Sequence, residues 1–527
     1  MNRTLPFPDT RPLAAQSALS LPPEVERPGL LVGWSLEESH RKTPVGFSFG
    51  DALRSPETGF VDPILMEAEG HLMTIAPTGA GKGVGCIIPA LLRHEGPAIV
   101  IDPKGENAMV TARHRREMGQ EVIVLDPMGV TDLPGATLNP LDLIEPRSPT
   151  GVDDAAVVVQ ALLPDDLGDM RNRFWVSRAR QLLLAAVLHV VTDLPEEKRS
   201  LATVRALMGS VAGAPQEVQR IFRKSRHPEV RAIAGNLSIA AAETLGGIIS
   251  FAQDGIDFLR GPRLQDAVSA TSFDLDKITR GDPVTLYLVL PPHMLSSHGR
   301  FLRLWISSLV TLVMRRRRRP RQSTLFILDE AAQLGTLNEL RTAITLLRGY
   351  GLQTWSFWQD LSQLQLLYPH DWQTMINNCA VLQAFGPNTQ QAAGEMARLL
   401  GFLSASEFLA LEADEMLLQI AGDEAVIAML PNYLRDPAFA GKFDENPLFD
   451  DDRDPVPERE IDRTYLRPAR KVRKTKPEAA AGECGPKQRN PVDEVLSKMI
   501  RDKLDERLAE QAGRSAEAGR DTEEGPP

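Results

Sequence analysis

A glycine-rich stretch from Gly70 to Gly85 constrains this chain more than any other feature. It is typical of a short apolar strand, a turn that holds Lys82, and the first turn of a helix. Glycines in such a turn free backbone N–H groups to converge on phosphate oxygens, while the helix N-terminus and the lysine add positive charge. The stretch therefore predicts a nucleotide-binding loop. The predicted binding residues are Thr78, Gly79, Ala80, Gly81, Lys82, Gly83 and Val84.

Two positions depart from the general pattern G-x-x-x-x-G-K-[ST] of such loops. Ala76 stands where the first glycine is expected, and Gly83 replaces the hydroxyl residue that normally contacts the metal. One Mg2+ ligand must then come from Thr78, from Asp329 or from water. Because magnesium readily keeps several waters, the loop still predicts ATP and Mg2+ as its cofactors.

The acid pair that this loop needs follows an apolar run beginning at Thr324. Asp329, at the tip of the predicted strand, is expected to hold the metal directly or through water. Glu330 is placed to orient and deprotonate a water that attacks the γ-phosphate. Two acids after an apolar strand are also what any strand shows where it meets solvent, but the pairing with Lys82 favours an ATPase.

A third catalytic candidate is Gln359, at the end of the next predicted strand. A neutral amide has both donor and acceptor atoms, so it can sense the γ-phosphate or position the water. The alternative is a surface glutamine that merely follows a strand.

Composition limits the classes of protein to consider. A chain of 527 residues predicts two or more domains, and the net charge of −11 argues against a protein that coats nucleic acid over its whole surface. Its three cysteines have no metal-site spacing and suit a reducing compartment. No window approaches the ~20 consecutive apolar residues that span a bilayer, and Phe301–Met314 comes nearest. We therefore expect a cytoplasmic protein.

Apolar runs alternate with helical patterns from about residue 61, which predicts an α/β fold with a mostly parallel sheet. Between Val152 and Leu264 the strands disappear, and an inserted all-α domain is expected. Within it, Phe174–Trp175 is assigned to helix packing rather than base stacking, and Glu229–Phe258 to a helix broken at its glycines. The expected strands are Leu72–Ala76, Ala98–Ile101, Glu121–Leu125, Val284–Leu290, Leu325–Leu328, Thr354–Trp358, Ala380–Phe385 and Glu424–Leu430.

These patterns divide the chain into five segments. An N-terminal arm with some short structure around Leu30–Trp34 is expected over 1–60, a nucleotide-binding domain over 61–150 and 266–444, the all-α domain over 151–265, and a mixed-charge tail over 445–527. The tail's composition predicts disorder, with one amphipathic helix at Val492–Ala512. The arginine run Arg315–Arg319 fits either a solvated helix C-terminus or a contact with the phosphate backbone of nucleic acid.

Several motifs together resemble the conjugative coupling proteins of type IV secretion, the TraG-type ATPases. The resemblance covers about residues 68 to 435. It is carried by Ala76–Gly85, Ile101–Glu106, Leu138–Leu141, Phe174–Trp175, Leu328–Ala331, Gln359–Leu364, Asn377–Ala380 and Phe385–Asn388. The departures at Ala76 and Gly83 are usual in that family.

The resemblance implies a RecA-like P-loop NTPase domain with an inserted all-α domain that recognises substrate or relaxosome. It implies a hexamer that uses ATP to bring relaxase-bound DNA, expected to be single-stranded, or protein substrates to the proteins of a secretion channel. A hexamer would need an arginine from a neighbouring subunit, for which Arg341 and Arg348 are candidates. Anchored members carry N-terminal transmembrane helices, which this sequence does not show. We therefore expect a soluble relative that is associated with the inner membrane through partners or that acts away from the channel.

Two other interpretations stay open at this point. One is a related hexameric translocase that moves along double-stranded DNA outside secretion. The other is an adaptor that binds nucleotide, hydrolyses little of it and recruits cargo through the all-α domain and the tail. ATPase activity measured with and without DNA separates the adaptor from both motors.

Overall fold

The computed structural model describes residues 29–36, 60–66, 69–164, 172–212, 215–237, 242–401, 403–420 and 425–449. The chain divides into two compact units, Met1–Ala469 and Arg470–Pro527, and every described residue belongs to the first. The predicted helix Val492–Ala512 and most of the predicted tail therefore lie outside the described residues.

An eleven-stranded sheet organises this unit, in the order β2-β1-β11-β10-β9-β3-β8-β7-β4-β6-β5. From β9 to β5 the neighbouring strands are parallel, and from β2 to β9 they are antiparallel. The predicted α/β class with a mostly parallel sheet is confirmed. The strands are β1 (Leu30–Leu36), β2 (Phe60–Met66), β3 (His71–Ile75), β4 (Ala98–Ile101), β5 (Glu121–Leu125), β6 (Val284–Leu288), β7 (Thr324–Leu328), β8 (Leu352–Trp358), β9 (Cys379–Ala384), β10 (Glu415–Ile420) and β11 (Val426–Met429).

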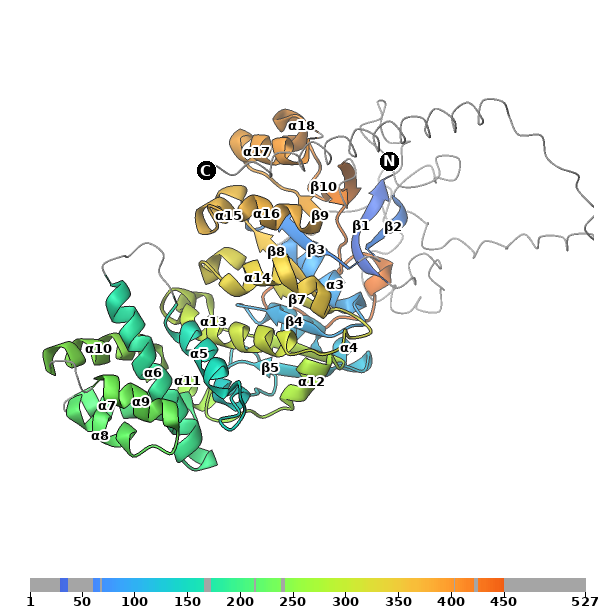
Figure 1. Cartoon of the computed structure of the whole chain (residues 1–527). Helices are drawn as coiled ribbons and strands as arrows, with labels where there is room; N and C mark the ends of the chain where they lie inside the picture. The colour runs from blue at the N-terminus through green and yellow to red at the C-terminus, as the bar shows by residue number, and fades with distance from the viewer. Residues whose placement is uncertain are drawn as a thin grey trace, which may run out of the picture. The chain divides into compact units, whose positions relative to one another are not determined.

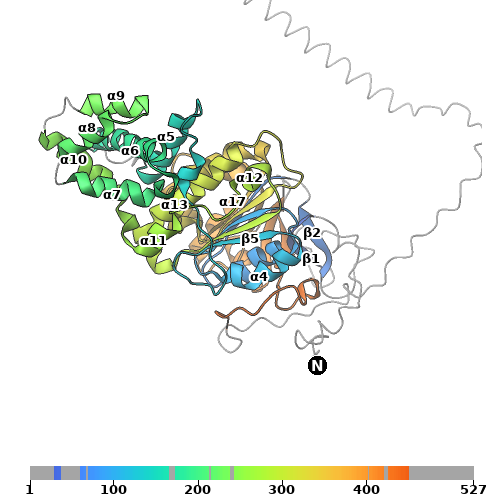
Figure 2. The same cartoon turned by 90° about the horizontal axis from the view of Figure 1, so that it is seen from below.

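Helices cover both faces of the sheet, as parallel strands require. Successive residues of β3 alternate between two cores: Met73 and Ile75 belong to one cluster, and Leu72 to the other. Figure 2 shows the sheet between α4 on one face and α13 on the other. On the α4 face lies α3 (Ile88–Arg93) beside α4 (Glu106–Glu117); on the α13 face lie α13 (Pro292–Met314), α14 (Asn338–Leu346), α15 (Leu361–Leu367), α16 (Trp372–Asn377) and α17 (Gln390–Leu400).

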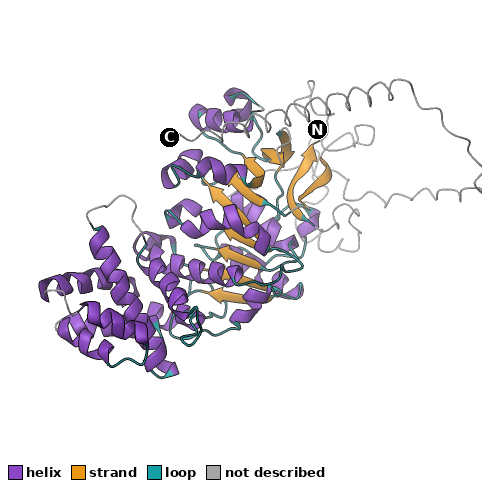
Figure 3. Cartoon of the chain, viewed as in Figure 1, coloured by secondary structure: helices purple, strands orange, loops and turns teal. Residues whose placement is uncertain are grey.

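Between β5 and β6 the described residues form helices and no strand (Figure 3). Figure 1 shows α6 to α10 grouped together, and their buried side chains continue the core on the α13 face of the sheet. This agrees with the element order predicted for an all-α insertion. The helices are α5 (Gly151–Leu162), α6 (Arg173–Asp193), α7 (Leu201–Ala212), α8 (Pro215–Arg223), α9 (Pro228–Leu237), α10 (Ala242–Asp254), α11 (Pro262–Ala267) and α12 (Leu275–Arg280).

Helix α6 is the one described helix that is long and apolar enough to cross a membrane. The sequence pattern pointed instead to Phe301–Met314 as the nearest approach, because arginines near the start of α6 break its apolar run. Half of its most apolar window is buried, and Leu182, Leu183 and Val187 are fully enclosed by neighbouring helices. We therefore assign α6 as the core helix of the all-α group.

The long helical segment Glu229–Phe258 was predicted to break at its glycines, and this holds at Gly255, which follows the last residue of α10, but not at Gly246 or Gly247. Helix α9 ends at Leu237 and α10 begins at Ala242, so Gly246 and Gly247 lie inside α10. A Cβ on Gly247 would lie 2.8 Å from the indole of Trp175, whose ring stacks on Phe251. This glycine provides room for an aromatic side chain, which sequence spacing alone does not reveal.

The sheet also extends further than the sequence indicated. Strand β1 falls in the predicted N-terminal arm, yet it pairs with β2 and with β11. Strand β10 was missed because a short apolar run of six residues fits a buried strand or a helix segment equally well.

The arginine run has three internal attachments. Arg315 donates to the carbonyl of Leu143 and pairs with Asp154 at 2.7 Å. Arg316 is 6 % exposed and donates to three backbone carbonyls on two segments, and Arg319 pairs with Glu69. Within this run, Arg317 and Arg318 are the two arginines that are exposed and have no partner among the described residues. The predicted contact with nucleic-acid phosphates is therefore restricted to these two.

Candidate nucleotide-binding site

The predicted loop follows β3 and leads into a π-type helical turn, Gly83–Ile87, that continues as α3. Gly79 and Gly81 have φ angles of 82° and 87°, which side chains rarely adopt. A Cβ at either position would meet open space, so their backbone is accessible to a ligand. Thr78 is exposed on the same loop, while Ala80 and Val84 are partly buried. The loop therefore presents its backbone to solvent at the carboxyl end of β3.

Lys82 is folded back onto this loop. Its ammonium donates to the carbonyl oxygens of Ala76, at 3.0 Å, and Pro77, at 3.4 Å. It also lies 3.5 Å from Oε1 of Glu330, and the lysine is 7 % exposed. All three partners are oxygens that a phosphate group can replace.

Glu330 has an unusual backbone. Its φ of 54° is the one positive value among the described non-glycine residues. This left-handed conformation costs on the order of 1–3 kcal/mol, and such strain gathers at functional sites. Nε2 of Gln359 donates to Oε2 of Glu330 at 2.8 Å, which connects the end of β8 to the end of β7. The three predicted catalytic residues thus meet, although their strands are far apart in sequence.

Asp329 lies beside them and accepts no hydrogen bond within the described residues. Burial, and then the charge of Glu330, raises its pKa to about 7, while the charges of Lys82 and Lys104 oppose that rise. A carboxylate without a donor suits a divalent cation, which favours the ionised form. Asp329 stays the predicted metal ligand, and Gly83 leaves the usual hydroxyl ligand absent.

Sequence reasoning missed a buried polar network beneath the loop. Thr74 donates to Oε1 of Gln383 at 2.6 Å and accepts from the indole of Trp355 at 2.8 Å. Gln383 in turn donates to the carbonyl of Val32. Hydrogen bonds thus join β8, β3, β9 and β1 just before the loop. The signal in the sequence that could have revealed this network was a polar residue inside an otherwise apolar strand.

A second loop supports the first from the β9 side. Gly386, with a φ of 65°, packs so tightly that a Cβ there would lie 2.9 Å from Cβ of Ala80. This glycine belongs to the Phe385–Asn388 motif, whose packing role the sequence did not show.

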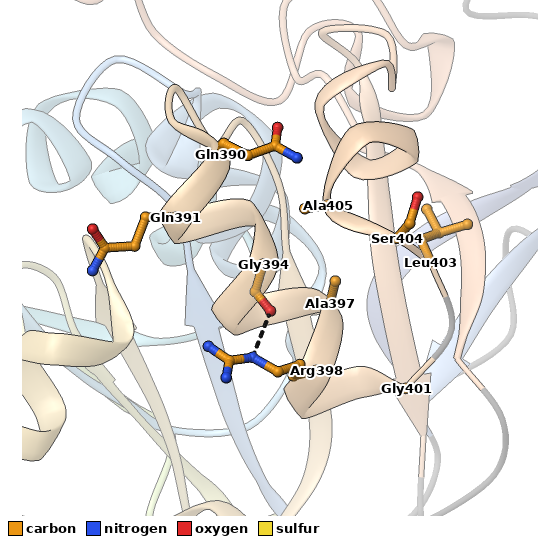
Figure 4. A pocket seen from close by; sticks show the side chains of 9 residues that line it. All are labelled: Gln390, Gln391, Gly394, Ala397, Arg398, Gly401, Leu403, Ser404 and Ala405. Carbon is orange, nitrogen blue, oxygen red and sulfur yellow. Dashed lines mark hydrogen bonds between the residues drawn. The ribbon is translucent and has the colours of Figure 1, made fainter.

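A cavity of about 550 Å3 lies elsewhere, between α17 and α18 (Ala405–Leu409). In Figure 4 its labelled residues all come from these two helices and the turn between them. Arg398 there donates to the carbonyl of Gly394 at 3.2 Å. The cavity contains none of the loop or acid residues, so it is not the site of phosphate chemistry.

The arginines considered for a neighbouring subunit's site are also placed. Arg341 pairs with Asp371 at 3.0 Å on the α14–α16 surface. Burial, and then the positive charge of Arg348, lowers the pKa of His71. His71 lies at the start of β3, at the strand end opposite to the nucleotide loop. Neither residue therefore belongs to the site of its own chain.

The comparisons with known proteins fit this geometry. Residues 34–428 match the family model described as type IV secretory system conjugative DNA transfer. The chain belongs to this family. It is 27 % identical over 353 residues to a conjugal transfer protein TraG of Escherichia coli, covering 63 % of this chain and 55 % of that protein. It is 30 % identical over 305 residues to TraG of Agrobacterium fabrum, covering 56 % and 45 %.

The chain therefore spans about half the length of these curated relatives. Among solved structures, the plasmid coupling protein TrwB bound to a non-hydrolysable ATP analogue matches with a TM-score of 0.56 and 18 % identity, covering 78 % of this chain and 98 % of that one. TrwB with ADP and Mg2+ matches with a TM-score of 0.51, 17 % identity, and coverage of 78 % and 97 %. Because these sequence identities are low, the likeness to TrwB shows the fold of this chain and nothing more.

Proposed function

We propose that this chain is an ATP-hydrolysing motor of the conjugative DNA transfer family, which delivers DNA or protein substrates to a type IV secretion channel. The observation that carries the proposal is the meeting of Lys82, Glu330 and Gln359 at the carboxyl ends of neighbouring parallel strands. Family membership supplies the transfer role, and the site supplies the chemistry.

In this proposal the glycine-rich loop binds the phosphates through backbone N–H groups, and Lys82 leaves the carbonyls of Ala76 and Pro77 to pair with phosphate oxygens. Mg2+ bound at Asp329 would stabilise the negative charge of the phosphates. Once Lys82 has turned away, Glu330 is free to accept a proton from the attacking water. Gln359 orients Glu330 through the hydrogen bond that already joins them.

The partners follow from family membership. We propose that the motor acts as a homo-hexamer on relaxosome-bound DNA, and that it associates with the inner membrane through channel proteins. The all-α group of helices is the proposed contact for substrate or relaxosome. We also propose the domain boundaries that the sequence indicated. These are 61–150 and 266–444 for the motor, and 151–265 for the all-α part.

The deciding experiment measures ATP hydrolysis by the full chain alone, with single-stranded DNA and with double-stranded DNA, beside its mass in solution. We expect DNA-stimulated hydrolysis that is lost in Lys82→Ala, with Lys277→Ala on α12, outside both the loop and the all-α part, as a control for the loss of a lysine. Stimulation by single-stranded DNA favours conjugative transfer, and stimulation by duplex alone favours a double-strand translocase. Nucleotide binding without hydrolysis under any of these conditions would leave the adaptor as the better function.

Binding of DNA at the arginine run is tested separately. Arg317 and Arg318 are exposed, whereas Arg315, Arg316 and Arg319 have internal partners. Replacing Arg317 and Arg318 with serine should lower the salt dependence of DNA binding by about 0.9 in the logarithmic slope for each phosphate that these arginines neutralise. An unchanged slope would exclude these two arginines from the DNA path.

A further inference from the structure

The turn after β4 lies at the same edge of the sheet as the acid pair. Strands β4 and β7 are parallel neighbours, with Ile101 opposite Leu328. The residues that follow, Asp102 and Asp329, therefore emerge side by side. Lys104, two residues further on, belongs to the Ile101–Glu106 motif and has no role in the chemistry assigned to the loop, the acids and Gln359.

This turn is held rigidly. The carboxylate of Asp102, 1 % exposed, accepts from the backbone N–H of Ala108 at 2.8 Å and from Nδ2 of Asn107 at 3.2 Å. Gly105 has a φ of 71°, and a Cβ there would lie 2.5 Å from the methyl group of Thr131. These contacts fix the backbone on both sides of Lys104, so its position is built into the fold.

The end of the turn is anchored as well. Oε1 of Glu106 accepts from Nδ2 of Asn446 at 2.6 Å, a contact made across 340 residues of sequence. Pro103 and Gly105 are buried, whereas Lys104 between them is exposed. The turn thus presents one long, charged side chain to solvent from an otherwise enclosed backbone.

Lys104 makes no hydrogen bond or ion pair with any residue in the described part of the chain. The register of β4 and β7 places the turn that carries it beside the turn that carries Asp329. Lys82 is already held by the loop carbonyls and Glu330. Of these two lysines, Lys82 is therefore engaged, and Lys104 has no partner within the described part of the chain.

The balance of charges at this edge of the sheet favours a role for Lys104 in binding phosphate. Carboxylates predominate over lysines among the site residues of β4 and β7, and a nucleotide triphosphate adds further negative charge where it meets them. A second cation on this side offsets that repulsion at the end of the phosphate chain. The carboxylates are Asp102, Glu106, Asp329 and Glu330.

We propose that Lys104 is a second phosphate-binding lysine, whose ammonium donates to the terminal phosphate of the bound nucleotide. The inference rests on the proposed ATPase function and adds a residue to its site. Lys82 binds from the glycine-rich loop and Lys104 from the β4 turn, so the terminal phosphate is held from two sides. An ammonium on a flexible stem with three donors is suited to follow that phosphate as it separates.

The proposal requires Lys104 to distinguish a triphosphate from a diphosphate. Equilibrium binding of ADP and of the non-hydrolysable analogue ADPNP, each with Mg2+, is measured on the full-length wild type, Lys104→Ala, Lys104→Arg and Lys198→Ala. Removal of one charge-assisted hydrogen bond should weaken ADPNP binding of Lys104→Ala by roughly tenfold to hundredfold. ADP binding should change less than about twofold, and Lys104→Arg should recover part of the affinity for ADPNP.

Unchanged ADP binding also shows that the variant is folded. Equal weakening for both nucleotides, or no weakening for either, overturns the proposal for Lys104. If the wild type and Lys104→Ala bind both nucleotides with equal affinity and hydrolyse ATP at equal rates, this inference fails and the proposed function stands. A wild type that binds neither nucleotide overturns both.

Discussion

Nζ of Lys82 lies 3.5 Å from Oε1 of Glu330, so the predicted phosphate-binding group and the predicted base form an ion pair. The lysine also satisfies the carbonyls of Ala76 and Pro77, and the carboxylate also accepts from Gln359. In the proposed mechanism, phosphate oxygens compete for the lysine, and its departure releases the base. The proposal thereby links binding and activation through one ion pair.

Replacing Glu330 with glutamine should separate these two steps. The amide keeps the shape of the side chain and its contact with Gln359, but it cannot take a proton from water. We expect kcat for ATP to fall by about 10²–10⁴-fold, the usual contribution of general base catalysis, while ADPNP binding persists. Steady-state hydrolysis and equilibrium binding measure the two effects, with Glu339→Gln on α14 as the control. Hydrolysis at the wild-type rate would remove Glu330 from the catalytic role.

Gln359 provides a second test of the same arrangement. Its amide donates to Glu330 at 2.8 Å, so Gln359→Ala removes a hydrogen bond that orients the base without removing the base itself. We expect kcat to fall by on the order of tenfold, with KM for ATP nearly unchanged. Gln359→Glu should be more damaging, because it places a like charge beside Glu330. If alanine at 359 hydrolyses ATP normally, the surface-glutamine alternative is correct.

The sequence predicted the parallel part of the sheet because its strands are buried on both faces and appear as continuous apolar runs. It also predicted the meeting of Lys82 with Glu330, because parallel strands bring their carboxyl ends to one edge. It did not predict β1, β2 or β10 as strands, and these join through antiparallel pairing between segments distant in sequence. Their short runs show no periodicity that separates a strand from other buried structure.

The same limit applies to single side chains. Gly247 looked like a helix breaker because local propensity counts the cost of glycine, whereas the indole of Trp175 requires the space that glycine leaves. The arginine run looked uniform in sequence, yet Arg316 is buried and Arg317 is exposed. Which arginine turns inward depends on carbonyls contributed by distant segments, and spacing carries no information about them.

The burial of Arg316 predicts a large effect on stability. Its guanidinium donates to the carbonyls of Ile278, Tyr350 and Gly351 and to the hydroxyl of Thr324. Arg316→Met removes all of these hydrogen bonds from a charged donor, although the carbonyls of Gly351 and Ile278 keep the backbone N–H groups of Thr324 and Gly281. The free energy of unfolding should therefore fall by about 3 kcal/mol. Urea denaturation measures this change in the free energy of unfolding.

The exposed neighbour is the matched control for that variant. Arg317→Met should change the free energy of unfolding by no more than about 0.5 kcal/mol, because its side chain faces solvent. Equal effects of the two substitutions would contradict the structural role of Arg316.

Asp193, the last residue of α6, predicts a pH dependence in the all-α part. Burial opposes its ionisation, but hydrogen bonds from Ser225, Arg226 and His189 outweigh that effect and lower its pKa to about 2. Because the folded pKa lies below the unfolded value, the ionised group stabilises the fold above pH ~4, and this contribution disappears as the pH falls toward 2.

Asp193→Asn removes that contribution and should cost on the order of 2 kcal/mol at pH 7. The difference from wild type should shrink as the pH is lowered from about 4, because the wild-type carboxyl then takes up a proton. Unfolding by urea across pH 7 to 3, followed by circular dichroism, measures both quantities, with Asp254→Asn at the end of α10 as the control. A constant difference between wild type and Asp193→Asn at every pH would mean that the carboxylate's charge contributes nothing, and that the hydrogen-bonding geometry alone holds the α8–α9 turn to α6.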